Sequence, residues 1–291
     1  MKNWIDKFLL SLFLFYIVHF CSFGSIIKHT LYINQGTFIT TNSTTFPALA
    51  FNDSKLYNRN STCIRLVPND QLILTVVNRD NIPHGFKIKN NTTSFGVIKP
   101  LESKTDTIAF TTEGVYIYYD DSNFPSNSYL GLSGFISVFK ATNAKSFYWN
   151  LKEHQIEFNR SLIQNKPVTW NTYDPDFFTI NGNSFPQLME DTLARIIGSV
   201  GDTINIFVGN TGQSAHALHF HGFHCKILYS SKSAVHKGWI KDSFPIKSME
   251  GMILQMVPDK LGEYSVHDHN LMAMSGELLH PFGMVMIMLI E

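Results

Sequence analysis

Apolar residues occur along this chain in short runs rather than at helical spacing. From residue 25 onward, segments rich in Val, Ile, Tyr, Phe and Thr are separated by Gly, Pro, Asn and Asp. Many short strands joined by such turns are typical of β-sandwiches. Helical periodicity is confined to residues 151–164. The pattern therefore predicts an all-β chain with one short helix in a connection.

The two halves of the chain repeat the same order of segments. In each half a turn-and-strand segment is followed six residues later by a histidine, His84 in the first and His216 in the second. Residues 114–121 align without a gap on residues 262–269. Repetition of this kind indicates two copies of one unit. The predicted organisation is a signal segment (1–24), a first β-domain (26–142), a linker with a short helix (143–176) and a second β-domain (177–291).

The composition of the chain excludes several classes of protein and of binding partner. The chain has 291 residues, of which 44% are hydrophobic, so it is long enough for two domains with real cores and is neither disordered nor collagen-like. Lys plus Arg and Asp plus Glu both number 23, which leaves no positive excess for a phosphate backbone and excludes nucleic acid as an expected partner. Hydrolase and nucleotide-binding motifs are absent from the sequence.

The N-terminus has the features of a secretory signal. Two lysines lie near the start, the run 8–20 is almost wholly apolar, and residues 22–24 form a small-x-small cleavage pattern. We therefore expect a secreted, periplasmic or cell-surface protein. Two alternatives are an uncleaved anchor and lipidation at Cys21.

The two cysteines that follow the signal, Cys63 and Cys225, allow one disulfide in an oxidising compartment. Two buried, unpaired thiols are an equally good interpretation. Glycosylation sequons, relevant only if the host glycosylates, begin at Asn42, Asn52, Asn60, Asn90, Asn91 and Asn159.

Histidines are concentrated in the second half, which contains eight of the 12. His219-Phe-His221 and His267-Asp-His269 are two His-x-His elements, and the period of two in a strand places both imidazoles of each on one face. If the two strands pair, four neutral imidazoles come together. Imidazole ligands suit copper, zinc or iron.

At this point the chain resembles the multicopper oxidase superfamily. Residues 216–222, His-Ala-Leu-His-Phe-His-Gly, match the family motif His-x-x-His-x-His-Gly, and residues 178–182, 242–245 and 262–264 resemble further family landmarks. The similarity extends to two-domain multicopper oxidases and copper nitrite reductases. It implies two tandem cupredoxin-like Greek-key β-sandwich domains and copper as the cofactor.

The resemblance also implies a ligand set. His219, His221, His267 and His269 match the histidines of type 2 and type 3 coppers. One or two metal ions held by three or four of these histidines are expected.

The type 1 copper site departs from the family pattern. His216 matches a type 1 histidine, but Asp268 stands where the family has the type 1 cysteine. A carboxylate cannot replace the thiolate bond of blue copper, so no intense blue colour is expected. His280 and Met284 could still form a displaced half-site with His216.

The first half has lost most of the equivalent site. His84 resembles a copper-binding histidine, whereas Tyr119-Asp120-Asp121 stands at the position of the family's His-Cys-His. A homo-oligomer that packs the first domain of a neighbour on the second domain would add only His84 and one of these aspartates.

Several residues have competing interpretations. His224 and His236 are surface or core histidines unless they bind metal. Met286 and Met288 either fill a core or offer soft sulfur to Cu(I). Asp268, pointing away from its flanking histidines, either orients another histidine or is a buried structural acid.

Together these features predict a copper-binding protein, acting as a copper-dependent oxidoreductase on a small-molecule or metal-ion substrate at a histidine site without a blue centre. The alternatives are a non-catalytic copper carrier that uses the Met-rich flank, and a structural relic of the fold.

Overall fold

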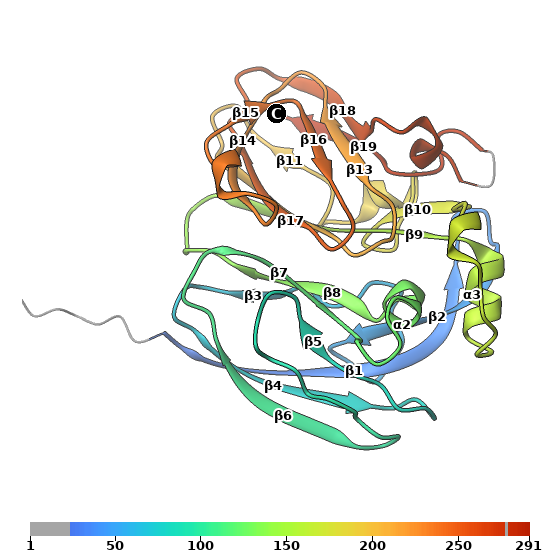
Figure 1. Ribbon diagram of the computed structural model, residues 1–291. Coiled ribbons are helices and arrows are strands. Elements are labelled where there is room, and N and C mark those ends of the chain that lie inside the picture. Colours follow the sequence, from blue (N-terminus) through green and yellow to red (C-terminus); the bar gives the residue numbers. More distant parts are fainter. Residues whose placement is uncertain (1–23, 277–278) are drawn as a thin grey trace, which may run out of the picture.

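The chain folds into two β-sandwiches that lie against one another, with the C-terminal half above the N-terminal half in Figure 1. The computed structural model describes residues 24–276 and 279–291. The predicted signal segment and its alternatives therefore lie almost wholly outside the described residues. Within those residues, no helix has both the length and the apolar character needed to cross a membrane.

The first sandwich pairs two four-stranded sheets around one apolar core. One sheet has the order β2-β1-β4-β6, formed by β1 (Ile26–Ile39), β2 (Thr45–Asn52), β4 (Gln71–Asn78) and β6 (Ser103–Ala109). The other has the order β3-β8-β7-β5, formed by β3 (Ile64–Leu66), β5 (Lys87–Ile88), β7 (Gly114–Tyr119) and β8 (Ser133–Val138). Parallel neighbours such as β1 and β4 are joined by crossing connections, as in a Greek key.

The second sandwich pairs a six-stranded with a five-stranded sheet. The six-stranded sheet has the order β10-β9-β12-β17-β14-β15, formed by β9 (Lys145–His154), β10 (Phe177–Ile180), β12 (Ile204–Asn210), β14 (Cys225–Ser230), β15 (Ile240–Lys241) and β17 (Gly251–Met256). The five-stranded sheet has the order β11-β19-β18-β13-β16, formed by β11 (Ile197–Gly198), β13 (His216–Phe220), β16 (Ser243–Ile246), β18 (Gly262–Asp268) and β19 (Val285–Ile290).

Helices are short and lie at connections, as the sequence predicts. The α-helices are α2 (Ser126–Leu130) and α3 (Ile156–Leu162), and the 3-10 helices are η1 (Trp170–Thr172), η2 (Gln187–Glu190), η3 (Ala234–His236) and η4 (Leu271–Met274). Figure 1 shows α3 beside α2 at the edge where the two sandwiches meet.

The expected linker at 143–176 needs correction. Its first part, Lys145–His154, is strand β9, which pairs in parallel with β12 from Lys145 to Leu151. The aromatic run at the centre of β9 explains the strand, because Trp149 is fully buried in the core of the second sandwich. Residues 139–144, between β8 and β9, connect the two sandwiches, whereas residues 155–176 join β9 to β10 within the second sandwich. Helix α3 occupies half of the predicted helical range 151–164.

The two sandwiches share an apolar interface. Val115, Ile117 and Phe135 of the first sandwich pack against Phe207 and Ile253 of the second. All six residues of β8 and all seven of β12 are buried, because each of these strands lies between two layers. This packing makes the described chain one continuous body rather than two units on a flexible linker.

The two described cysteines are not bonded to each other. Cys225 is buried and Cys63 is partly buried, and both thiols are free. Burial raises the pKa of the Cys63 thiol to about 12, so it stays protonated. Of the two interpretations that the sequence left open, the structure agrees with two unpaired thiols and not with a disulfide.

Candidate metal centre

Strands β13 and β18 pair with one another and so bring the two His-x-His elements together. The strands run antiparallel with His219 directly opposite His267. Along both strands the alternate residues Leu218, Phe220 and Val266 are buried in the core, so the histidines point to the outer face. This outer face lies at the top of the second sandwich, away from the interface with the first.

The four imidazoles of this histidine cluster, His219, His221, His267 and His269, are in mutual contact. The ring centroid of His219 lies 4.8 Å from that of His221, 5.6 Å from that of His267 and 4.8 Å from that of His269. His221 and His267 are 5.0 Å apart. His219 and His267 are half-buried, whereas His221 and His269 are exposed, so a small molecule in solvent can reach the cluster.

Hydrogen bonds define which nitrogen each half-buried ring presents. Nδ1 of His267 donates to the carbonyl oxygen of Asp268 at 2.8 Å, because a carbonyl can only accept. Nδ1 of His219 lies 2.9 Å from Ser243 Oγ, and Ser243 Oγ donates to Asp242 at 3.0 Å, so His219 Nδ1 is the donor to Ser243. Both rings therefore carry their proton on Nδ1 and leave the lone pair of Nε2 free for a ligand.

The lowered pKa of His219 also favours the neutral form of its ring. Burial, followed by the nearby charge of His221, lowers the pKa of His219. Nε2 of His221 lies 2.9 Å from Nε2 of His267, where the His221 N–H donates to the free lone pair of His267. A metal ion bound to His267 would take the place of this proton.

The four imidazoles lie close together, but they do not form a closed metal-coordination site. Over residues 24–276 and 279–291, no group of three or more His, Cys, Asp or Glu side chains has the spacing of a formed metal site. The rings instead contact one another edge to face. The donor set fits copper or zinc by its chemistry, and rotation of exposed imidazoles would complete the coordination.

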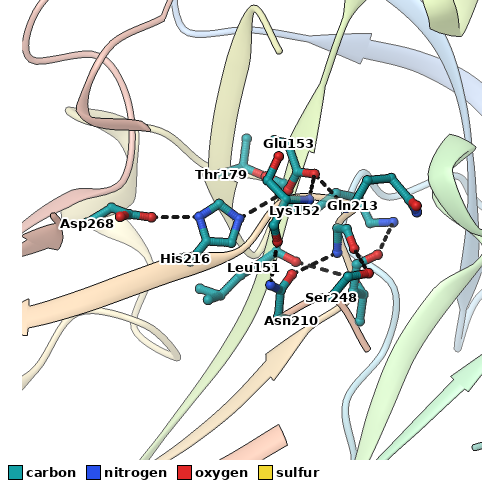
Figure 2. Close-up of polar contacts among 12 residues, drawn as sticks. Leu151, Lys152, Glu153, Thr179, Asn210, Gln213, His216, Ser248 and Asp268 are labelled. Atoms are coloured by element: carbon teal, nitrogen blue, oxygen red, sulfur yellow. Dashed lines mark hydrogen bonds and ion pairs between the residues drawn. The ribbon is translucent and has the colours of Figure 1, made fainter. Parts of the chain in front are cut away.

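His216 faces the opposite side of β13, inside the sandwich. Its Nδ1 lies 2.6 Å from Oδ2 of Asp268, and its Nε2 lies 3.1 Å from Oε2 of Glu153 on β9; Figure 2 shows the ring held between the two carboxylates. The His216 side chain is 1% exposed, and the side chains of Asp268 and Glu153 are wholly buried. The ring is thus clamped at both nitrogens.

Electrostatics make this a buried ion-paired triad, Glu153–His216–Asp268. Burial alone would lower the pKa of His216, but the hydrogen bonds with Asp268 and Glu153 raise it to about 9. Burial would raise the pKa of Glu153, but the hydrogen bond from His216 and backbone amides lower it to about 2. A protonated imidazole is therefore fixed between two carboxylates at neutral pH.

This arrangement contradicts the expected half-site of His216 with His280 and Met284. Neither ring nitrogen of His216 is free for a metal. The Met284 side chain is fully buried in the apolar core, and His280 is exposed. Met286 and Met288 are fully buried in the same core, which is the core-filling role.

Asp268 also has the structural role that the sequence left open. Besides His216, its carboxylate accepts hydrogen bonds from the backbone amides of Ala217 at 3.2 Å and Asn270 at 2.8 Å. It therefore ties the end of β18 to β13, beneath the histidine cluster.

His224 and His236 do not belong to the histidine cluster. The ring of His236 lies against that of Trp239 in a tilted arrangement, and its Nδ1 lies 3.3 Å from Ser230 Oγ. His224 is exposed on the turn before β14. Neither is tied by a hydrogen bond to the four clustered rings in the described part of the chain.

The first sandwich contains a matching triad, Asp80–His84–Asp120. Nδ1 of His84 lies 2.7 Å from Asp120 and Nε2 lies 2.9 Å from Asp80. The sequence alignment had paired His84 with His216 and Asp120 with Asp268, and each aspartate contacts Nδ1 of its own histidine. The second carboxylates, Asp80 and Glu153, were missed. Asp80 could have been found four residues before His84, whereas Glu153 comes from a strand 63 positions away.

Comparison with known proteins agrees with this architecture. Residues 157–284 match the family model described as multicopper oxidase. No curated protein sequence matches the chain.

Solved structures with a similar fold include copper proteins. A blue copper oxidase from Nitrosomonas europaea has 19% sequence identity, with 91% of this chain and 86% of that chain covered and a TM-score of 0.77. A copper nitrite reductase from Nitrosomonas europaea has 18% identity, with 92% and 94% covered and a TM-score of 0.72. The multicopper oxidase mgLAC has 17% identity, with 92% and 87% covered and a TM-score of 0.77. The predicted fold of two cupredoxin-like sandwiches is thereby confirmed.

Proposed function

Residues 157–284 match the multicopper oxidase family model, and most of the chain has the fold of a blue copper oxidase and a copper nitrite reductase; on this basis we propose that it binds copper at the histidine cluster. The ligands are drawn from His219, His221, His267 and His269. The observation that carries this proposal is the pairing of His219 with His267 across β13 and β18. It gathers four imidazoles on an accessible outer face.

The cluster suits copper by its donor chemistry. Neutral imidazole is a preferred ligand of copper, and a second hydrogen bond on Nδ1 orients the ring and raises its basicity. His219 and His267 both have this support, from Ser243 and from the carbonyl of Asp268. Copper held there would supply one-electron redox chemistry at a position open to solvent.

The function we propose is that of a copper-dependent oxidoreductase without a blue type 1 centre. Asp268 occupies the position that we align with the type 1 cysteine, and its carboxylate is already committed to His216. Long-range delivery of electrons through a type 1 thiolate is then absent. A small-molecule or metal-ion substrate would have to meet the histidine site directly.

The chain's own residues support such direct contact. Exposed His221 and His269 lie at the open side of the cluster, and Asp242 lies behind Ser243 with a depressed pKa caused first by the hydrogen bond from Ser243. The Asp242 carboxylate therefore stays ionised and holds the Ser243 hydroxyl in place to accept from His219. This chain of three groups fixes the His219 tautomer that presents Nε2.

A copper carrier without catalysis has less support. That alternative relies on methionine sulfur for Cu(I), and Met284, Met286 and Met288 are fully buried. Export from the cytoplasm belongs to the proposal and is supported by the sequence of residues 1–24 alone.

Copper titration of the purified protein tests the proposal. We expect copper to bind with an EPR spectrum of nitrogen ligation and without an intense thiolate charge-transfer band. His219→Ala and His267→Ala should each remove most of the bound copper, while His224→Ala, an exposed histidine of the same domain, should retain it. Equal copper content in all three variants would show that the cluster is not the site.

Oxygen consumption by the copper-loaded protein tests the catalytic part. Oxygen uptake is followed with phenolic and metal-ion substrates. Nitrite is tested separately by its loss in the presence of an added electron donor, because nitrite reduction consumes no oxygen. Turnover that disappears in His219→Ala and persists in His224→Ala supports an oxidoreductase. Copper binding without turnover on any of these classes would instead support the carrier.

A further inference from the structure

The two buried triads differ in how well their outer carboxylates are satisfied. In the second sandwich the Glu153 carboxylate receives four hydrogen bonds: from His216 at 3.1 Å, Ser214 N at 2.7 Å, Gln213 N at 2.5 Å and Tyr173 Oη at 3.2 Å. An ionised carboxylate has about four acceptor positions. Glu153 is therefore saturated by protein donors.

Asp80, which has the corresponding place in the first sandwich, is not saturated. In the described part of the chain its side chain accepts from two donors, His84 Nε2 at 2.9 Å and the amide of Asn81 at 2.7 Å. The side chain is only 6% exposed. A buried charged group with unused acceptor positions is costly unless a further donor reaches it.

Asp80 lines a cavity of about 220 Å³. This Asp80 cavity lies between the start of α2, the end of α3 and the loop after β4. It is large enough for a small organic molecule and not only for one water. Its wall combines one carboxylate and several amide side chains with aliphatic side chains. The polar residues are Asp80, Gln35, Asn81, Asn127 and Asn165, and the aliphatic residues are Leu49, Ile82, Leu130, Leu162 and Ile163.

The charge around the cavity is negative. Two carboxylates, Asp80 and Asp120, flank one imidazole, His84, so the triad has a net negative charge whether or not the ring is protonated. Among residues 24–276 and 279–291, no lysine or arginine pairs with Asp80 or Asp120. His84 can balance one of the two carboxylates, and a cation that enters the cavity would balance the other.

The residues that line the cavity limit the kind of cation that can bind there. Calcium and magnesium sites gain affinity from the number of charged oxygen ligands, whereas this cavity offers a single carboxylate, that of Asp80, among amide and aliphatic side chains. An ammonium group needs only two or three acceptors. The aliphatic wall requires an apolar body attached to that group.

We propose that the Asp80 cavity binds a small organic cation, a primary ammonium on a short aliphatic chain. The ammonium lies at Asp80 and the chain packs against Leu130 and Ile163. This binding site is separate from the histidine cluster, which belongs to the other sandwich, and does not depend on copper.

Isothermal titration of the metal-free protein with n-butylammonium tests the site. We expect saturable binding that weakens at least tenfold in Asp80→Asn and is unchanged in Asp106→Asn, an exposed aspartate on β6 of the same sandwich. The neutral isostere 1-butanol should bind at least tenfold more weakly than n-butylammonium. Absence of saturable binding, or equal binding by wild type and Asp80→Asn, overturns the proposal.

A second variant guards against loss of folding in Asp80→Asn. Ile163→Trp fills the cavity without touching the triad, and it should abolish n-butylammonium binding while the circular dichroism spectrum is retained. Unchanged binding in a folded Ile163→Trp protein overturns the proposal. So does displacement of n-butylammonium by millimolar calcium or magnesium, which would make the cavity a metal site.

Discussion

Asp268 Oδ2 lies 2.6 Å from Nδ1 of His216 inside the second sandwich, although the residues on either side of Asp268 point outward into the histidine cluster. One strand thus serves two environments. Its outer face offers imidazoles to solvent, and its inner face closes a buried ion-paired triad. The buried triad on the inner face therefore lies beneath the histidine cluster on the outer face.

Asp268→Asn should destabilise the protein strongly. The amide has the same shape but no charge, so it leaves the buried His216 imidazolium with one carboxylate instead of two. Removing one partner of a buried ion pair typically costs about 3–5 kcal/mol. We expect a loss in the free energy of unfolding of about 3 kcal/mol by urea titration at pH 7. Asp259→Asn, at an exposed turn, is the control and should change it by less than about 0.5 kcal/mol.

Stability should fall at alkaline pH because of the triad. The pKa of His216 is raised from 6.5 to about 9 in the folded chain, so the folded state holds a proton that the unfolded state releases. The contribution is fully present below pH 6.5 and is lost as the pH rises through about 9. A shift of this size corresponds to on the order of 3 kcal/mol.

Urea unfolding between pH 6 and pH 10 measures this effect. His84, whose pKa is also raised by its two aspartates after burial has opposed the shift, contributes with the same sign. His216→Asn should therefore reduce the slope and not abolish it. An unchanged slope in that variant would show that His216 is not protonated in the folded protein.

Gly212→Ala should disturb the same triad from the opposite side. A Cβ at this position would lie 1.9 Å from Oε2 of Glu153, so the carboxylate would have to move away from His216. We expect a loss in the free energy of unfolding of about 1–3 kcal/mol. In a double-mutant cycle with Glu153→Gln the two losses should be less than additive, because both act on one contact. Full additivity would place the cost of the alanine elsewhere.

Ser243→Ala should weaken copper binding without changing the ligands. Without the hydroxyl, Nδ1 of His219 loses its acceptor and the tautomer that presents Nε2 is no longer favoured. Loss of such a supporting group typically costs 10–100-fold in metal affinity, and we expect about a tenfold rise in Kd by competition titration. Ser265→Ala removes a hydroxyl from β18 while leaving the His219–Ser243 pair intact, and its Kd should match that of the wild type.

Local sequence pattern was enough to predict much of the site. The period of two in a strand places His219 with His221, and His267 with His269, on common faces wherever those strands lie. The sequence left the pairing of these two strands as a condition, and β13 does pair with β18. The same alternation requires Asp268 to point away from its flanking histidines, whatever its partner.

Contacts between distant segments could not be predicted in the same way. Glu153 reaches His216 only because β9 joins the sheet of the second sandwich, beside β12, and residues 145–154 had been assigned to a linker. Without Glu153, His216 remained a candidate metal ligand with His280 and Met284. The ion pair at both ring nitrogens removes that role.

The sequence by itself determined the fold class and the repeat, because both follow from the order of strand-forming and turn-forming segments along the chain. It also determined that the two histidines of each His-x-His element share one face, because side chains alternate along a strand. Tertiary structure alone decided which carboxylates enclose His84 and His216, and which one, Asp80, borders a cavity. The physical reason is that burial and ion pairing depend on which segments pack together, and two strands 63 residues apart carry no local signal of their contact.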